Sequence, residues 1–389
     1  MEKIIKNINY KMLGFNCFII LFIISFTNFK NLNILRYIAL AILQMFCIFD
    51  MIKDKKTDAN KNYIVIVLLL LISMMFSLFK TINFKESIFK ILIIIDFLIF
   101  CYILLPKYLK EFEFSEIFKN LLNDIFILLF LLFVLFHNDY IFSYDMNRVG
   151  NLVRLRCGFN HPNTLAIFTF IGLLIGIYFI FTEKNRWKYI IYVLFFGIIL
   201  IKSGARTPLY VLIIFLILYL KDMVIKNNKL KLLVCSFTIA MVIFYMICNG
   251  YNIRNIDFDT INTILSYRLT YIKNAIEKMN ENNAIFVGMG AFRNSMTFVT
   301  GSIMLDNGYF NYIYQYGIIS FSVLLAILWN NFKIIKMSNE INVNKIFIKN
   351  MYISFLIYSF FENILFNISS LLAILVYTFI NIMNIREKR

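Results

Sequence analysis

The chain has 389 residues, of which 61% are hydrophobic and only 16% are charged, and its mean hydropathy is +0.76. A soluble domain of this size could not cover so much apolar surface, so the composition excludes a soluble globular protein. The formal net charge of +17 accompanies short lysine-rich segments between apolar runs, which is typical of a membrane topology signal. We therefore expect the lipid bilayer as a partner and no nucleic acid.

Apolar runs of about 17–25 residues recur along the whole chain, and each is long enough to cross a hydrocarbon core of ~30 Å. They predict an all-α polytopic membrane protein with about twelve transmembrane helices, forming a single transmembrane domain over residues 1–389. The seventh run is short and the last two are close together, so eleven spans are the alternative. The runs lie at about 13–29, 34–52, 63–79, 88–106, 121–137, 163–182, 188–202, 207–220, 230–248, 308–332, 347–361 and 364–383.

The connections between the runs predict the orientation in the cytoplasmic membrane. Segments 53–61, 183–188 and 221–231 are lysine-rich, and the positive-inside rule puts them, with both termini, in the cytoplasm. Two longer connections then lie outside, at about 138–162 and 249–307. The second is the main extracytoplasmic loop, between the ninth and tenth spans, and its segment 266–279 could form a helix along the membrane surface.

Arginine does not follow lysine in this topology, since eight of the eleven arginines fall outside. Arginine carries a planar fork that pairs with phosphate through two hydrogen bonds, whereas a topology signal needs only charge. Contact with lipid headgroup phosphates explains any single one of these arginines, but a phosphate-binding site explains the set better. The eight are Arg36, Arg148, Arg154, Arg156, Arg206, Arg254, Arg268 and Arg293.

Three predicted spans begin at the outer face with residues that suit a helix N-terminus. These starts are Asn160 to Asn163, Ser203 to Pro208, and Asp306 to Gly308. A helix N-terminus presents free N–H groups and a partial positive charge, which together favour an anion. Ordinary capping explains the proline, threonine and asparagine residues, but not Arg156 and Arg206 beside two of the starts. The pattern predicts an anion site at the outer face.

Four motifs, in order over about residues 145–330, resemble those of the O-antigen ligase and polymerase superfamily of bacterial membrane proteins. The first resembles the family's Arg-then-Gly-Phe-x-x-Pro-Asn motif, the second its Ser-x-x-Arg-Thr stretch, the third its Arg-helix followed by Phe-x-Gly-x-Gly, and the fourth its late Asn-and-aromatic motif. The first four spans match only in hydropathy. The motifs are RLRCGFNHPNTLA, SGARTPLYVLI, SYRLTYIKNAI with NAIFVGMGAF, and LDNGYFNYIYQYGIISF.

The resemblance implies a glycosyltransferase that takes a glycan from an undecaprenyl-diphosphate-linked oligosaccharide at the outer face. A polymerase moves the growing glycan onto the next lipid-linked repeat unit, and a ligase moves it onto another acceptor, lipid A core sugar. Family ligases carry a histidine just ahead of the asparagine of the late motif, where this chain has Leu305-Asp306-Asn307. This departure favours a polymerase for capsule, exopolysaccharide or O-antigen, with a flippase and a chain-length regulator as pathway partners. A ligase-type transferase is the alternative.

Transfer from a diphosphate carrier requires that the leaving diphosphate be stabilised and that the acceptor hydroxyl lose its proton. Asp257 and Asp259 have the spacing of a metal-binding pair but are interpreted as loop surface, so we expect neither metal nor other cofactor. Arg156, Arg206 and Arg268 are the candidates to neutralise the leaving group. Asp306 is the candidate catalytic base, and the alternative is that it only caps the tenth span.

The remaining candidates are assigned to substrate binding. Arg154 and Arg268 would hold phosphate, and Asn163, Asn307 and Tyr309 would hydrogen-bond to the substrate. His161 could bind phosphate or sugar, or only cap the helix that begins at Pro162.

A transporter, such as a flippase for lipid-linked oligosaccharides, is the competing function from another class. Transporters commonly show internal repeats, broken helices and polar residues at mid-membrane. The sequence shows none of these clearly, and its polar motifs lie in the outer connections, which favours the transferase.

Overall fold

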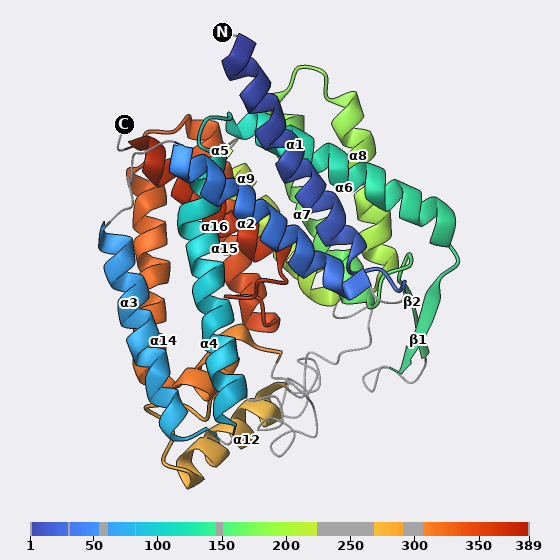
Figure 1. Cartoon of the computed structure of the whole chain (residues 1–389). Helices are drawn as coiled ribbons and strands as arrows, with labels where there is room; N and C mark the ends of the chain where they lie inside the picture. Colours follow the sequence, from blue (N-terminus) through green and yellow to red (C-terminus); the bar gives the residue numbers. More distant parts are fainter. Residues whose placement is uncertain are drawn as a thin grey trace.

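The computed structural model describes residues 2–29, 32–53, 61–81, 83–144, 151–223, 268–290 and 306–387. Its helices pack into one bundle, with both termini at the top of Figure 1 and the β-hairpin and helix α12 toward the opposite end. The bounds are α1 Glu2–Ile24, α2 Leu35–Lys53, α3 Lys61–Met75, α4 Phe84–Ile99, α5 Leu105–Leu109, α6 Phe114–Phe136, α7 Pro162–Thr182, α8 Trp187–Lys202, α9 Arg206–Met223, α12 Arg268–Glu281, α14 Gly308–Met337, α15 Asn342–Phe361 and α16 Leu371–Glu387.

The predicted all-α class is confirmed for the described residues, with one small exception. Eleven of the twelve predicted spans each overlap a helix, the fourth being formed by α4 and α5 joined through a π-helical turn at Phe100–Leu104. The last predicted span, 364–383, begins too early, since α16 starts only at Leu371. The ninth predicted span, 230–248, lies outside the described residues. The exception falls in the predicted connection 138–162, which contains an antiparallel hairpin of β1 (Tyr140–Tyr144) and β2 (Asn151–Leu155).

Five helical segments are long and apolar enough to cross a membrane, which agrees with a membrane protein. Two shorter apolar helices, Tyr10–Ile24 and Val65–Phe79, accompany them, and the predicted total of twelve spans exceeds what the described helices show. The five are Leu32–Lys53, Phe84–Leu109, Phe114–Phe136, Pro162–Thr182 and Gly308–Met337.

Helices α7 and α16 form the centre of the bundle, and both are apolar on every side. A helix that is hydrophobic all round is one that is surrounded by other protein segments. Most side chains of both helices are buried. Helix α8 packs closely on α7 because Gly172 and Gly176 leave room there, and a Cβ atom on either glycine would lie 2.7 Å from Phe196 or Val193. This centre fixes the starting point of α7, where several predicted site residues lie.

Helix α14 is broken at Gly317, whose φ of 76° and ψ of 174° are not helical. The turn at 284–290 fills the break with its backbone. Met289 N donates to Tyr314 O at 2.8 Å and Gly290 N to Gln315 O at 3.0 Å, while Ile318 N donates to Ile285 O at 3.0 Å. A break of this kind is tolerated in a helix long and apolar enough to cross a membrane, because protein groups satisfy the freed backbone.

The same turn follows α12, which carries Arg268 at its first position. Ala275 and Met279 of α12 pack with Tyr314 of α14 in a small apolar cluster of their own. The sequence allows a helix over 266–279, and a helix is present there from Arg268 to Glu281. The turn and this cluster together hold α12 against the part of α14 around the break.

Alanine at Gly288 is expected to destabilise the protein by about 1–3 kcal/mol, a typical cost of forcing atoms into a packed site. Gly288 has a φ of +83°, and an added Cβ would collide with the backbone of Gln315 and Gly317. Gly197→Ala is the matched control, since nothing lies within 4 Å of a Cβ built at that helical position. Thermal unfolding in detergent should show a lower Tm for Gly288→Ala alone, and equal values for both variants would contradict this role of the turn.

Candidate functional site

Arg154, at the end of β2, is held between the starts of two helices. Its Nε donates to Ser203 O at 2.9 Å, and its Nη2 donates to Asn163 Oδ1 at 2.6 Å. Gly204, with a φ of +62°, lies against the Arg154 side chain, and a Cβ there would be 3.2 Å from Cγ of the arginine. Both acceptors are neutral groups, and the two bonds orient the guanidinium between the two helix starts.

Asn163 connects Arg154 to an acidic residue that was not among the predicted site residues. Its Nδ2 donates to Glu362 Oε1 at 3.5 Å. Glu362 is the residue that ends α15, and its main chain also faces the start of α14, because a Cβ on Gly308 would lie 3.1 Å from Glu362 O. The end of α15 therefore meets the starts of α7 and α14.

Arg268 and Asp306 form a loose ion pair next to this point. Their charged groups are 3.9 Å apart, and the side chains are 20% and 65% exposed, respectively. Nε of Arg268 is buried without a hydrogen-bond partner among the described residues. A buried guanidinium N–H without a partner is costly, and an anion would satisfy it.

We call Arg154, Asn163, Arg268, Asp306 and Glu362 the outer cluster, after the outer face that the sequence predicts for it; they come from four separate stretches of the chain. Burial raises the pKa of the Glu362 carboxyl to about 7, and the Asp306 charge adds to that rise. Arg268 and Arg154 act in the opposite direction. All three charged groups are therefore close enough to Glu362 to influence its protonation.

Glu362 is the functional candidate that sequence reasoning missed. An acidic residue at the end of an apolar run commonly just extends its side chain into water. The position of Glu362 in the sequence therefore did not indicate a functional role. Among the described residues, no cation lies within 4 Å of its carboxylate. A largely buried carboxyl group of this kind, with a pKa near 7, is suited to exchange a proton with a substrate at neutral pH.

His161 caps α7, because its Nδ1 accepts a hydrogen bond from Asn163 N at 3.1 Å. The predicted capping role of His161 is therefore carried by its Nδ1. In the neutral ring the proton then lies on Nε2, which can donate a hydrogen bond. Burial and the Arg154 charge lower the pKa of His161, outweighing Asp306, which raises it. A neutral ring is thus favoured near pH 7.

Capping of α14 falls to Asn307 and not to Asp306. The Asn307 side chain accepts hydrogen bonds from Tyr309 N at 3.1 Å and Phe310 N at 3.0 Å. The interpretation of Asp306 as a cap is therefore wrong, since a buried asparagine already does this. Tyr309 donates its hydroxyl to Leu356 O of α15 at 3.0 Å, which ties the start of α14 to α15.

Arg156 and Arg206, the other predicted catalytic residues, have different surroundings. Arg156 forms an ion pair with Asp139 at 2.5 Å, and Asp139 also accepts from Gly158 N at 2.9 Å. No hydrogen bond or ion pair among the described residues joins Arg156 to the outer cluster. Arg206 is the first residue of α9, two positions after Gly204, which contacts Arg154.

Asp139 and Arg156 brace the base of the β-hairpin, where the chain turns into α7. The turn that follows, around Gly158, is fastened to the end of α1. Asn28 N donates to Gly158 O at 2.7 Å, and Asn160 N donates to Phe26 O at 3.0 Å. The first helix thereby fixes the segment that carries Arg154, His161 and Asn163.

The described residues contain no group of three or more His, Cys, Asp or Glu side chains arranged to hold a metal ion. Asp257 and Asp259 lie outside the described residues. Within the outer cluster, the guanidinium groups can bind an anion, and Glu362 or Asp306 can exchange a proton.

Comparisons with known proteins add no relative to this description. No family model matches the sequence, and no curated protein matches it. The resemblance to the O-antigen ligase and polymerase superfamily accordingly rests on the four sequence motifs and remains a prediction.

Proposed function

We propose that this protein is a multi-span glycosyltransferase of the cytoplasmic membrane that polymerises surface polysaccharide. Its donor is a glycan linked to undecaprenyl diphosphate, and its acceptor is the next lipid-linked repeat unit at the outer face. The observation that carries the proposal is the convergence of Arg154, Arg268, Asp306 and Glu362 at the helix ends. Two guanidinium groups beside two carboxylates provide both an anion site and a proton acceptor.

The orientation in the membrane is part of the proposal. The two termini lie at one end of the bundle, and the outer cluster lies near the end of α1 away from its N-terminus. The lysine-rich connections then face the cytoplasm, and the cluster faces outward, as the positive-inside rule requires. Twelve spans, both termini inside and the main outer loop at 249–307 complete this topology.

In the proposed reaction, the acceptor hydroxyl attacks the anomeric carbon of the donor sugar. The bond between that carbon and the diphosphate oxygen breaks, and its electron pair leaves with the diphosphate. Arg154 and Arg268, with Arg206 at the start of α9, stabilise the negative charge of this leaving group. The hydroxyl proton passes to Glu362, which replaces Asp306 as our first candidate for the base because Asp306 is paired with Arg268 and mostly exposed.

Purified protein in liposomes should convert a synthetic undecaprenyl-diphosphate repeat unit into a ladder of longer lipid-linked glycans, and added chelator should leave the ladder unchanged. Movement of the repeat unit across the bilayer without elongation would contradict the proposal and indicate a flippase. Transfer of a preassembled glycan to another acceptor, without a ladder, would indicate the ligase-type alternative. If the ladder formed without chelator and was lost when chelator was added, only the expected metal independence would be contradicted.

A further inference from the structure

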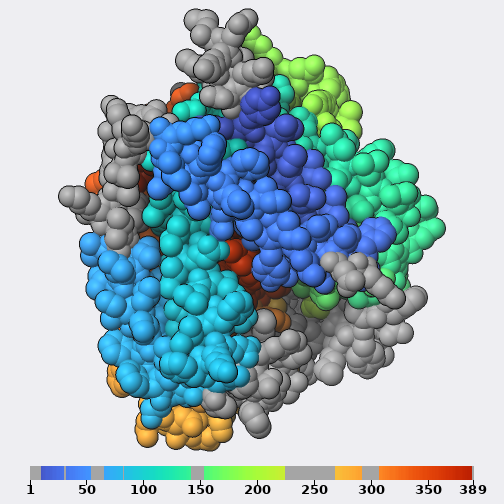
Figure 2. Space-filling model, viewed as in Figure 1, coloured from blue at the N-terminus to red at the C-terminus, as the bar shows by residue number. Residues whose placement is uncertain are grey.

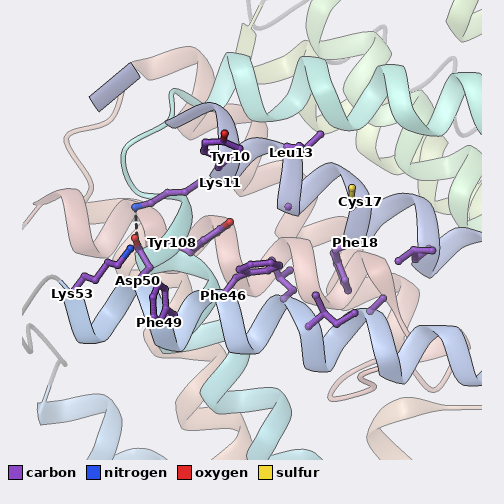
Figure 3. Close-up of a pocket in the computed structure, with 15 residues that line it drawn as sticks. Tyr10, Lys11, Leu13, Cys17, Phe18, Phe46, Phe49, Asp50, Lys53 and Tyr108 are labelled. Atoms are coloured by element: carbon purple, nitrogen blue, oxygen red, sulfur yellow. Dashed lines mark hydrogen bonds and ion pairs between the residues drawn. The ribbon is translucent and has the colours of Figure 1, made fainter. Parts of the chain in front are cut away.

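An open groove runs between α1 and α2, at a distance from the outer cluster. It encloses a cavity of about 340 Å³ and is lined mostly by apolar side chains, with Tyr108 of α5 at its floor. Figure 3 shows that its charged residues, Lys11, Asp50 and Lys53, gather at one end, while Phe18 and Cys17 lie toward the other. The groove is therefore amphipathic along its length.

The charged end of the groove lies on the side of the two termini. Lys11 is in the first half of α1, and Lys53 is the last residue of α2, which Figure 1 shows running back toward the N-terminal end of α1. The opposite end of α1 is fastened to the segment of the outer cluster through Asn28 and Gly158. A lipid whose phosphate is bound in the outer cluster would therefore have its headgroup at the end of α1 opposite to the charged end of this groove.

The charges at this end are unevenly paired. Lys11 Nζ is 2.7 Å from Asp50 and 3.3 Å from Glu111, so two carboxylates neutralise it. Lys53 lies over the ring of Phe49 at 4.3 Å and has no carboxylate of the described residues within 4 Å. Among the described residues that line this end of the groove, Lys53 is exposed and is the lysine not paired with a carboxylate, so it can bind an external anion.

The groove is longer than one leaflet of the hydrocarbon core, so it has room for the full length of one acyl chain. Lining residues on α2 extend from Ala39 to Lys53, which is ~21 Å at 1.5 Å per residue, against ~15 Å for half of the hydrocarbon core. A helix of ~10 Å diameter over that length would need more than ~1,500 Å³, far more than the cavity offers. The outward face of α2 is apolar and open, as Met45 at 70% and Ile52 at 68% exposure indicate, and Figure 2 shows α1 and α2 on the surface of the molecule.

We infer that the groove holds an anionic phospholipid of the leaflet on the side of the termini, with its phosphate at Lys53 and one acyl chain between α1 and α2. The inference rests on the proposed membrane embedding and not on the transfer reaction. The bound lipid fills the gap between the two helices, and α1 in turn supports the segment that carries Arg154.

Cys17 supplies a native probe, because it lines the groove and is exposed, whereas Cys47, Cys101 and Cys157 are buried and serve as internal controls. The full chain, freed of lipid and held in amphipol, is alkylated with a maleimide, and each cysteine is followed by peptide mass spectrometry. Adding phosphatidylglycerol at ten times its Kd should slow the labelling of Cys17 about tenfold. Lys53→Ala should weaken this protection, and Leu13→Trp, which fills the groove from an exposed position, should abolish its dependence on lipid.

Leu68→Trp is the matched control, an equally exposed apolar position on α3 outside the groove, and it should retain the full protection. Undecaprenyl phosphate, added in place of phosphatidylglycerol, should protect Cys17 poorly. The inference would be overturned if phosphatidylglycerol gave no protection, or if only the polyprenyl lipid protected Cys17. It would also be overturned if both Lys53→Ala and Leu13→Trp left the protection unchanged. Polymerising activity is not part of this readout, so its outcome is separable from that of the proposed function.

Discussion

Replacing Glu362 with glutamine is expected to lower the rate of glycan transfer about a hundredfold or more, the range that a positioned proton acceptor contributes. Glutamine keeps the size and the hydrogen bond with Asn163 but cannot take up a proton. Donor binding should remain, because the guanidinium groups of Arg154 and Arg268 are unchanged. The measurement is elongation of a lipid-linked repeat unit in liposomes, beside donor binding by the same preparation.

The pH dependence provides the second readout for Glu362. Burial and Asp306 raise the pKa of this carboxyl to about 7, and a base works only when it is deprotonated. The wild-type rate should therefore increase with pH through about 7 and level off above it, whereas the Glu362→Gln rate should be low at every pH. Glu362→Asp should recover part of the activity and retain the rise with pH.

Asp306→Asn is the matched control, since this neighbouring carboxylate is 65% exposed and ion-paired with Arg268. Its loss should keep the rate within about tenfold of the wild type and shift the rise toward lower pH, because the Asp306 charge contributes to the raised pKa of Glu362. The assignment of the proton acceptor would be wrong if Glu362→Gln kept the wild-type rate and pH profile while Asp306→Asn lost them.

The sequence predicted the helices well because the bilayer sets a simple rule of length and hydrophobicity. Most of the described runs contain a helix, including α7, whose start at Pro162 follows from its cap and proline, whereas the run predicted at 364–383 is helical only from Leu371. Broken backbone was harder to predict. The glycine at 317 lies inside an apolar run, and only its partner turn at 284–290 shows why the helix opens there.

The site was predictable where helix starts carry distinctive residues and not where partners come from elsewhere. Asn163 and Asp306 were found from such starts, and Arg154 from the count of arginines on the outer side; the structure brings the three into one cluster with Arg268. Arg156 forms an ion pair with Asp139 because the β-hairpin brings the residue after β2 beside the residue before β1. The pattern of apolar runs does not predict this hairpin. Glu362 was missed because its importance depends on three helix ends that meet only in the fold.

Arg154→Ala is expected to weaken binding of the lipid diphosphate donor about tenfold to a hundredfold, since a charged hydrogen bond contributes ~1.5–3 kcal/mol. Arg154→Lys should also bind the donor weakly. Lysine lacks the planar fork with which the arginine can bond Ser203 and Asn163 and still present an N–H group to a phosphate. Arg186→Ala, which removes an exposed arginine at the start of α8, is the matched control and should bind the donor normally.

Binding of an undecaprenyl-diphosphate oligosaccharide to purified protein, followed by native mass spectrometry, tests the central claim most directly. We expect one donor per chain for the wild type and the Arg186→Ala variant, and clear loss of it for Arg154→Ala and Arg268→Ala. Equal donor occupancy in all four proteins would show that the guanidinium groups of the outer cluster do not hold the diphosphate, and the proposed transferase would fall with that result.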